Sequence, residues 1–388
     1  MRLRFSSPIW LWVKALLCLV AVDILLFRVG LVWQAGPDFG IGLGGENWRL
    51  LFAAAHEIET RRPSTPTAVV VGSSVVIFGV EQNQVAERLR QDGVPGDFLR
   101  FVTHGSTATD SALMAWSSRT FEPWLVIYGV AARDFPKAGY MDSAVVRTFY
   151  DASVELPRLP RAGVDDILDA YARRYWKLYR YRFFTLKAVE AVTAKRLRQL
   201  GISTPSFAAE APGTSILPPE AMQYFPAYRM TPKAWAAWST WRQSRRFSDY
   251  LAWMQTSSSV AVNIYKTQTL ASFGPEGNLQ VESLRWMLAT LQRSHTRTVL
   301  LSFPENPVFR DPEAKAYFDP ALSDAYADLL RREADAHGAR FEDLRDLLQP
   351  EEFYDLVHAN LVGQRKLSAR IAAIIEEEWR ARRAPGPP

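Results

Sequence analysis

The sequence of 388 residues contains a single cysteine, Cys18, which excludes an intramolecular disulfide and a cysteine-based zinc site. Its five histidines include no pair four residues apart and no His-x-His, so we expect no metal site. The net charge of +5, from 46 basic and 41 acidic residues, lacks the concentrated excess typical of a nucleic-acid-binding protein. No motif indicates a cofactor. Hydrophobic residues make up 48% of the chain, enough for one large folded domain or two modest ones.

One long apolar segment, residues 9–33, follows a short tail, residues 1–8, that carries Arg2 and Arg4. About 20 apolar residues are enough to span a bilayer as a helix. Basic residues on the short leading side favour a cytoplasmic tail with the rest of the chain outside. No small-residue cleavage site follows, so we expect an uncleaved anchor rather than a removed signal peptide. The sequence predicts a single-pass protein of a bacterial inner (cytoplasmic) membrane, with its C-terminal domain in the periplasm or outside.

Three charged residues interrupt the apolar segment: Lys14, Asp23 and Arg28. The two basic side chains can reach the membrane interfaces, but a carboxylate within the bilayer costs a few kcal/mol. Two interpretations of Asp23 follow. It meets a polar group of another membrane protein, or the span lies nearer the N-terminus and Asp23 sits close to the interface.

After the anchor, short β-branched or apolar runs alternate with helical patterns. The expected strands cover residues 67–72, 98–103, 124–129, 298–303 and 339–341. The expected helices cover residues 81–91, 110–116, 321–337 and 361–379. The order is β-α-β-α-β, a long insertion, then β-α-β-α. This order predicts a doubly wound α/β fold with a mostly parallel five-stranded sheet.

The pattern also predicts how the chain is divided. The expected segments are a linker or helix at 34–66, an α/β domain formed by 67–139 and 295–380, a helical insertion at 140–294, and a flexible tail at 381–388.

The insertion is rich in basic and aromatic residues. Residues 173–198 contain nine basic side chains against one acidic one, which indicates either a patch for an anionic polymer or lipid headgroups, or an ordinary solvated helix face. The nine are Arg173, Arg174, Lys177, Arg180, Arg182, Lys187, Lys195, Arg196 and Arg198. Trp235, Trp238 and Trp241 recur at helical spacing, which is typical of core packing, although such rings can also stack on sugars.

Chemically capable residues follow the expected strands, and the carboxyl ends of strands are where a doubly wound sheet carries its site. The first strand ends in Gly72-Ser73-Ser74 and the second in Thr103-His104-Gly105, while Asp355-x-x-His358 precedes the last helix. A serine at a strand-to-helix turn presents its hydroxyl beside backbone N–H groups. The Asp-x-x-His spacing lets the carboxylate accept from Nδ1–H and leaves Nε2 free as a base.

The order of these motifs resembles the SGNH, or GDSL-like, hydrolase superfamily of esterases and acyltransferases. The resemblance implies an α/β/α sandwich, with Ser74 as nucleophile, His358 and Asp355 as its partners, and the N–H groups of Ser74 and Gly105 in the oxyanion hole. It covers residues 67–135 and 298–375. The third block of the family usually supplies an asparagine, whereas here the matching loop offers Arg133, a charged donor that could replace it.

Three further residues are candidates for substrate binding. Ser73 stands where many relatives have aspartate, and His104 adjoins the second-block glycine, although an ordinary hydrogen-bonded loop histidine explains it as well. Asn306 follows the fourth strand, where it either lines the site or belongs to a turn bounded by prolines.

Within the superfamily, the anchor, the Gly-Ser-Ser motif and the aromatic insertion are most similar to alginate O-acetylation proteins and to the D-alanyl transfer protein of teichoic acid synthesis. Those relatives work beside a multi-spanning membrane-bound O-acyltransferase. The resemblance implies a polysaccharide or other envelope polymer as partner, and transfer of an acyl group from Ser74 to a sugar hydroxyl. Two alternatives are a periplasmic carbohydrate esterase and a non-catalytic polysaccharide assembly protein that binds a membrane O-acyltransferase.

Overall fold

The structure is a computed structural model of the chain. It describes residues 8–28, 31–34, 46–61, 65–135, 144–149, 163–185, 197, 199–202, 219–221, 223–225, 231–257, 278–316 and 319–383.

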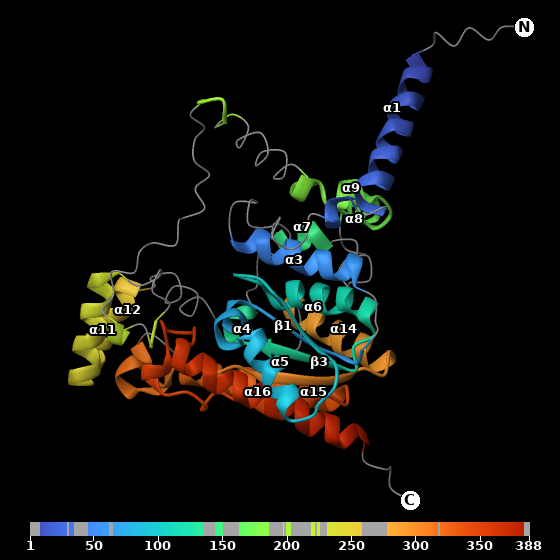
Figure 1. The fold of residues 1–388 in the computed structure, drawn as a ribbon. Helices are drawn as coiled ribbons and strands as arrows, with labels where there is room; N and C mark the ends of the chain where they lie inside the picture. Colours follow the sequence, from blue (N-terminus) through green and yellow to red (C-terminus); the bar gives the residue numbers. More distant parts are fainter. Residues whose placement is uncertain are drawn as a thin grey trace, which may run out of the picture.

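A five-stranded parallel sheet forms the centre of the molecule (Figure 1). Its strands are β1 (Thr67–Gly72), β2 (Asp97–Val102), β3 (Leu125–Val130), β4 (Arg297–Ser302) and β5 (Arg340–Asp343). They are arranged in the order β2-β1-β3-β4-β5. The α/β class and the parallel five-stranded sheet predicted from the sequence are confirmed.

Helices cover both faces of this sheet. The helices are α4 (Ser74–Gly79), α5 (Gln82–Gln91) and α16 (Leu361–Arg383) on one face, and α6 (Ala108–Ser117), α14 (Leu279–Arg293) and α15 (Pro320–Ala336) on the other. Outside α6, α3 (Glu46–Thr60) packs against β2 and α7 (Ala144–Phe149). A strand covered on both faces needs a continuous apolar run, and every residue of β1 and β3 is buried.

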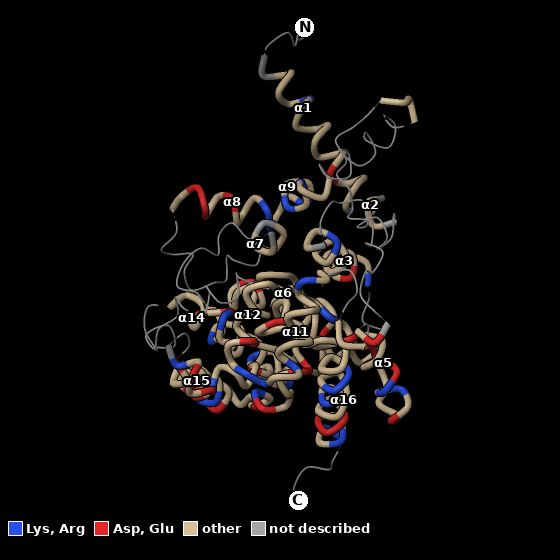
Figure 2. The backbone as a smooth tube through the Cα atoms, turned by 90° about the vertical axis from the view of Figure 1, so that its left-hand side faces the viewer, with Lys and Arg blue, Asp and Glu red and all other residues tan. Residues whose placement is uncertain are grey.

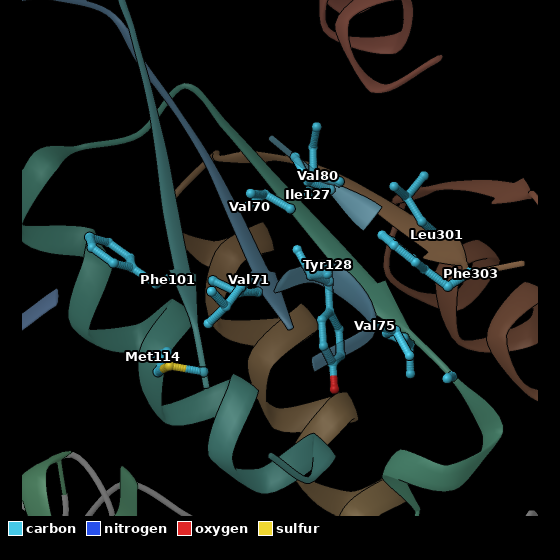
Figure 3. Close-up of a cluster of buried hydrophobic side chains, with 14 of the residues drawn as sticks. Val70, Val71, Val75, Val80, Phe101, Met114, Ile127, Tyr128, Leu301 and Phe303 are labelled. Atoms are coloured by element: carbon cyan, nitrogen blue, oxygen red, sulfur yellow. The ribbon is translucent and has the colours of Figure 1, made fainter. Parts of the chain in front are cut away.

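The core between the sheet and its helices is tightly filled (Figure 3). Val71 and Tyr128 are register partners on β1 and β3, and the next pair along is Gly72 and Gly129. A Cβ placed on Gly72 would lie 2.5 Å from the carbonyl oxygen of Gly129 and would also meet Val76 of α4. Glycine is therefore required where α4 leaves the sheet, because any side chain would push the two strands or the helix apart.

The N-terminal helix α1 (Pro8–Asp23) continues through a π-helical turn, Ile24–Arg28, and protrudes from the α/β layers (Figure 1). Its span Trp10–Arg28 is long and apolar enough to cross a membrane, and 11% of that span is buried inside the protein. The expected span of 9–33 extends further toward the C-terminus than this apolar helix does. Within α2 (Leu31–Gln34), Trp33 is buried against aromatic side chains of the protein, so this part of the segment belongs to the folded core.

Asp23 finds its partners within the chain. Its carboxylate accepts a hydrogen bond from Nε of Arg28 at 3.3 Å and another from the backbone N–H of Leu178, on the short helix α9 (Lys177–Arg180). Both contacts lie at the end of the span. This geometry favours the second interpretation of Asp23, a carboxylate close to the interface, and no second membrane protein is needed to explain its burial.

The expected insertion of 140–294 extends too far at its C-terminal end. Helix α14 packs against α6 and β4 as the crossover between β3 and β4, so it belongs to the α/β layers. The sequence pattern missed it because its apolar face is spaced like that of any amphipathic helix in the insertion. The described remainder of the insertion consists mainly of α7, α8 (Val164–Tyr175), α9, α11 (Pro232–Ser244) and α12 (Phe247–Ser257).

The tryptophans of α11 pack as a core. Trp238 and Trp241 are buried, Trp235 stacks on Trp238 with ring centroids 5.0 Å apart, and Trp241 stacks on Trp253 of α12 at 5.4 Å. Core packing, the interpretation that their helical spacing favours, is confirmed for the two buried rings.

The basic run is only partly described, since Lys187, Lys195, Arg196 and Arg198 lie outside the described residues. In its described part, Arg173 pairs with Asp169 at 2.7 Å, Lys177 pairs with Glu59, and Arg180 donates to the carbonyl of Thr148. These three side chains hold the helices in place instead of forming a free cationic patch.

The close contact at Gly72 yields a stability prediction. We expect Gly72→Ala to destabilise the protein by about 1–3 kcal/mol, because the added methyl group overpacks the close contact with Gly129 and Val76. The melting temperature, measured by circular dichroism in detergent, should fall by several degrees. Gly163→Ala is the control, since a methyl group there meets only a carboxylate oxygen of Asp166 at 3.9 Å. A Gly72→Ala protein whose melting temperature is no lower than that of the Gly163→Ala protein would contradict this account of the close contact at Gly72.

Candidate active site

The candidate site lies where the winding of the sheet reverses direction. From β1 the chain passes through α5 to β2 on one side, and from β2 it passes through α6 to β3 on the other. The carboxyl ends of β1 and β3 are therefore adjacent with no crossover between them, which is where doubly wound sheets bind ligands. Ser74 begins α4 directly after β1, and Arg133 lies in the 3-10 turn Ala132–Asp134 directly after β3.

The structure brings Ser74, His358 and Asp355 together in one chain of hydrogen bonds. Nε2 of His358 lies 2.8 Å from Oγ of Ser74, and Nδ1 of His358 lies 2.8 Å from Oδ2 of Asp355. The other carboxylate oxygen of Asp355 accepts the backbone N–H groups of Val357 and His358, both at 2.9 Å. This local turn fixes the carboxylate beneath the imidazole. Ser74 and His358, which are 284 positions apart in sequence, thus form with Asp355 the arrangement of a nucleophile, a base and an orienting acid.

The loop that carries His358 is pinned at both ends. Phe353 and Ala359 form an isolated antiparallel bridge, and the backbone N–H of Tyr354 donates to the carbonyl of His358 at 2.7 Å. The side chain of Asn360 then donates to the carbonyl of Glu351 at 2.7 Å and accepts from the first turn of α16. The imidazole is therefore held by a closed loop, and its position does not depend on the bond to Ser74.

The surroundings of the site keep His358 uncharged and Asp355 ionised at neutral pH. Burial lowers the pKa of His358 below 6.5 despite the opposing effect of Asp355, and the positive charge of Arg133 lowers it further. Burial alone would raise the pKa of Asp355, but the charge and hydrogen bond of His358 and two backbone N–H groups outweigh burial and keep that pKa below 3.8. At neutral pH His358 is uncharged, with its proton on Nδ1 facing an ionised carboxylate. Nε2 is then free to accept the proton of Ser74.

Arg133 makes the second polar contact of the nucleophile. Its Nη2 donates to Oγ of Ser74, while its Nε lies 3.7 Å from Oδ1 of the buried Asp134. Asp134 accepts the backbone N–H of Ala131 at 3.0 Å, and burial raises its pKa to about 6 although the charge of Arg133 opposes this. The resemblance implies Arg133 as an oxyanion donor. The structure places its guanidinium on the hydroxyl oxygen of Ser74, where a cation would stabilise negative charge on that oxygen.

Gly105 and His104 form a turn beside the nucleophile, fixed by Asn47 of α3. The side-chain oxygen of Asn47 accepts the backbone N–H of His104 at 2.8 Å, and its amide donates to the carbonyl of His104 at 3.3 Å. Gly105 has a φ of +69°, which favours glycine, and a Cβ there would meet nothing within 4 Å. The His104 ring packs edge-on against Phe78, with centroids 5.9 Å apart.

Ser73 lies on the Asp134 side of the turn after β1. It is fully buried, its hydroxyl makes no cap to α4, and it interacts with the Asp134 carboxylate closely enough to lower the pKa of that group. The hydroxyl of Ser74 contacts His358 and Arg133 instead. The expected contact of Ser73 with substrate stays a prediction.

Asn306 is also buried, and it acts as a structural link. Its side-chain oxygen caps the following 3-10 turn at Val308, and its amide donates to the hydroxyl of Tyr250 on α12. The structure contains the proline-bounded turn that the sequence allowed, and a role of Asn306 in substrate binding stays a prediction. Burial, with the nearby charge of Asp355, raises the pKa of Tyr250 well above 10. Tyr250, which belongs to the insertion, thus lies close enough to Asp355 to be affected by its charge.

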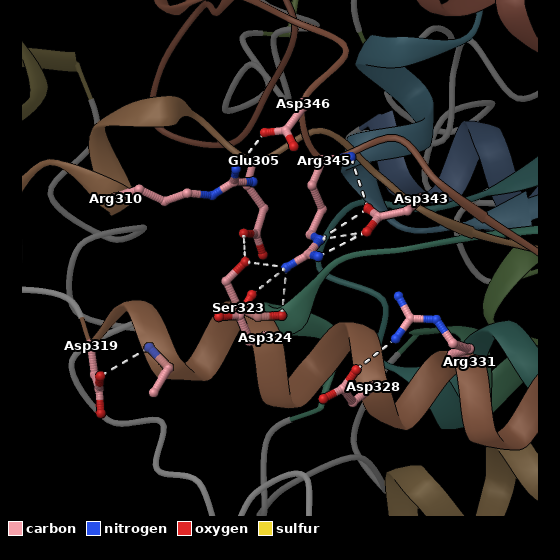
Figure 4. Close-up of polar contacts among 11 residues, drawn as sticks. Glu305, Arg310, Asp319, Ser323, Asp324, Asp328, Arg331, Asp343, Arg345 and Asp346 are labelled. Atoms are coloured by element: carbon pink, nitrogen blue, oxygen red, sulfur yellow. Dashed lines mark hydrogen bonds and ion pairs between the residues drawn. The ribbon is translucent and has the colours of Figure 1, made fainter.

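A polar network that runs from the surface to a buried glutamate holds the loop after β4 in place (Figure 4). Arg345 binds Asp343 through two nitrogens, at 2.9 and 2.8 Å, and donates to the hydroxyl of Ser323 at 2.7 Å. Ser323 in turn donates to Glu305, which is buried next to Asn306. This chain of contacts ties the position of Asn306 to α15 and to the end of β5.

Aromatic side chains wall the site on the side of the insertion. Phe78 of α4 lies over His358, with ring centroids 4.7 Å apart, and stacks on Tyr354 at 6.1 Å. Tyr354 contacts Phe225, which packs against Trp238 of α11 at 5.0 Å. The insertion therefore continues the hydrophobic surroundings of the imidazole, and their burial is what lowers the pKa of His358.

Sequence reasoning missed Phe78, Tyr250 and Asn47 as parts of the site. Phe78 carries a usable signal, since it stands four residues after Ser74 and one helical turn returns it to the same face. Tyr250 and Asn47 carry none, because their contacts join segments far apart in the chain.

Within the described residues, no group of three His, Cys, Asp or Glu side chains is placed to hold a metal ion. No protein-family model matches the chain, and no curated protein sequence matches it either. The resemblance to the SGNH superfamily therefore rests on the motifs themselves.

The lowered pKa of His358 predicts how reactivity depends on pH. A neutral imidazole is required to take the proton of Ser74, so reaction with a fluorophosphonate should fall as His358 becomes protonated. Because its pKa lies below 6.5, we expect the rate to level off at neutral pH and to reach half its maximum below pH 6.5. Rates of labelling measured between pH 4.5 and 8, roughly spanning the ordinary histidine range, test this.

Arg133 gives the matched comparison. Arg133→Gln removes a positive charge that lowers the pKa of His358, so the midpoint should move to higher pH, while Arg133→Lys should keep it near the wild-type value. A midpoint that is unchanged in Arg133→Gln, or a wild-type midpoint above 6.5, would show that the electrostatic account of the base is wrong.

Proposed function

We propose that this protein is a membrane-anchored, extracytoplasmic serine acyltransferase that O-acetylates an envelope or secreted polysaccharide through an acyl-serine intermediate. The observation that carries the proposal is the hydrogen-bonded chain from Ser74 through His358 to Asp355 at the carboxyl edge of the sheet. An α/β frame alone supports many activities, so the proposal depends on this site and not on the fold.

In the first half-reaction, Nε2 of His358 removes the proton of Ser74 as Oγ attacks the carbonyl carbon of an acyl ester or thioester. The bond from that carbon to the donor oxygen or sulfur breaks, and His358 returns the proton to the leaving group. The N–H groups of Ser74 and Gly105 are the proposed donors to the tetrahedral oxyanion. Arg133 supports this step because its cation stabilises the oxygen of Ser74 as that oxygen loses its proton.

In the second half-reaction, a sugar hydroxyl takes the place of the leaving group. His358 removes its proton, the sugar oxygen attacks the acyl-serine, and Oγ of Ser74 leaves and recovers the proton from His358. Asp355 stays ionised throughout and stabilises the imidazolium. Water in place of the sugar would make the protein an esterase, and the three residues by themselves do not distinguish the two acceptors.

Three features support transfer at a membrane surface. The span Trp10–Arg28 offers an anchor, and Arg2 and Arg4 before it favour an extracytoplasmic catalytic domain. The aromatic wall formed by Phe78, Tyr354 and Phe225 shields the imidazole from water, which disfavours hydrolysis of the acyl-serine. The motifs also resemble those of polymer-acylating SGNH proteins, which work beside a membrane-bound O-acyltransferase, and we propose such a protein as the acyl donor.

The test uses the full-length protein in detergent with 4-nitrophenyl acetate as donor and a mixture of oligosaccharides as acceptor. Nitrophenol release reports formation of the acyl-serine, and mass spectrometry detects acetylated sugar. We expect acetyl transfer to exceed hydrolysis. Ser74→Ala should lose both signals by at least about 10³-fold, because removal of a nucleophile disables the whole triad. Ser294→Ala, a change far from the site, is the matched control.

Nitrophenol release without acetylated sugar would replace the transferase with an esterase. Absence of both signals in folded wild-type protein would contradict any catalytic function and would favour a non-catalytic assembly protein.

A further inference from the structure

Helix α8 presents its apolar side away from the protein. Val164, Leu168, Tyr171 and Tyr175 recur at intervals of four, three and four residues, so they lie on one side of the helix. They are exposed by 72%, 62%, 46% and 68%. The opposite side is turned inward and includes the buried Ala170 and Arg173. We call the exposed stripe of Val164, Leu168, Tyr171 and Tyr175 the outer face of α8.

This arrangement reverses the usual orientation of an amphipathic helix. Apolar residues scattered singly on a surface are ordinary, but a continuous stripe marks a place where something else is bound. The rings of Tyr171 and Tyr175 stack on one another, with centroids 6.4 Å apart, so the aromatic end of the stripe is ordered. Tyrosine is typical of surfaces that are apolar on one side and wet on the other.

The outer face lies at the level where the candidate membrane span ends. Arg28, the last residue of the span, donates to the backbone carbonyl of Tyr175 at 3.4 Å. Asp23 accepts the N–H of Leu178, which directly follows α8 on α9. Figures 1 and 2 both show α8 and α9 beneath the end of α1, between that helix and the α/β layers. The outer face is thus continuous with the surface through which α1 would enter a bilayer.

Side-chain contacts join α8 to α9, and α9 to the body of the protein. Within α8, Arg173 on the inner side pairs with Asp169, and the Asp169 carboxylate also accepts the hydroxyl of Tyr179 on α9. On α9 and just beyond it, Lys177 pairs with Glu59 of α3, and the Tyr181 hydroxyl donates to the same carboxylate at 2.8 Å. The outer face is therefore linked to α3 through α9.

Charge also points to the occupant. Three of the basic side chains described in the run, at 173, 177 and 182, have acidic neighbours within the chain, so their charge is balanced there. The outer face itself consists of apolar side chains and tyrosines, which is the chemistry of a headgroup–acyl boundary.

We propose that the outer face of α8 lies in the interfacial layer of the bilayer that α1 crosses, as a second membrane contact of the same chain. A single spanning helix leaves a domain free to tilt and rotate, whereas two contacts fix its orientation. The proposal depends on α1 spanning a membrane and is independent of the proposed chemistry. The second membrane contact holds the carboxyl edge of the sheet at a defined height and angle to the membrane surface.

The experiment measures the depth of α8 in phosphatidylcholine vesicles that contain the full-length protein. Cys18→Ser removes the single native cysteine, and Leu168→Cys then accepts an environment-sensitive fluorophore on the outer face. Asp166→Cys is the matched control, since it is exposed on nearly the opposite side of the same helix. Lipids with a spin label near the headgroup quench from the membrane side, and iodide quenches from water.

We expect the label at 168 to be quenched by the spin-labelled lipid at least about twofold more than the label at 166, and by iodide at least about twofold less, because interfacial helices bury their apolar face by about 5–10 Å. Equal quenching at the two positions by both quenchers would overturn the proposal. The outer face would then be a surface for a protein partner. Neither outcome depends on Ser74 being active, so this test and that of the proposed function fail separately.

Discussion

The close approach of β1 and β3 at Gly72 and Gly129 is the constraint on which the site depends. Neither glycine has room for a side chain, since Val76 of α4 fills the space beside both, and a Cβ on either would collide with its neighbours. Because the strands meet without a crossover between them, Ser74 leaves β1 within reach of the turn that carries Arg133 after β3. The close packing of the two glycines thus places Ser74 beside the cation of Arg133 at the carboxyl edge of the sheet.

Burial then acts differently on the two carboxylates near that point. Asp134 is buried with its pKa raised to about 6, because burial outweighs the charge of Arg133, the backbone N–H of Ala131 and the hydroxyl of Ser73. Asp355 is as deeply buried, yet the imidazole and two backbone N–H groups outweigh burial and keep its pKa below 3.8. The balance between burial and the surrounding charges and donors therefore differs at the two carboxylates. One acid therefore steadies a cation on the nucleophile, and the other orients the base.

The strands and the main candidate site residues could be predicted from the sequence because they depend on local patterns. Apolar runs such as residues 67–72 and 124–129 predict strands, and the residues that follow them predict where chemistry gathers. The structure brings Ser74, His358 and Asp355 together as expected, while their catalytic role stays a prediction. Long-range side-chain contacts were not accessible. The burial of Ser73 and Asn306, the link from Tyr250 to Asn306, and the role of α14 as a crossover all follow from how distant segments pack, and one sequence carries no signal for that.

The central claim is that Ser74 is an activated nucleophile, and covalent labelling tests it most directly. The account predicts that a fluorophosphonate adds one adduct to the folded protein, and that peptide mapping by mass spectrometry places it on Ser74 and not on the adjacent Ser73. His358→Ala should abolish the adduct, because it removes the base that lies 2.8 Å from the hydroxyl. A folded protein that gives no adduct, or one whose adduct persists in His358→Ala, would contradict the account.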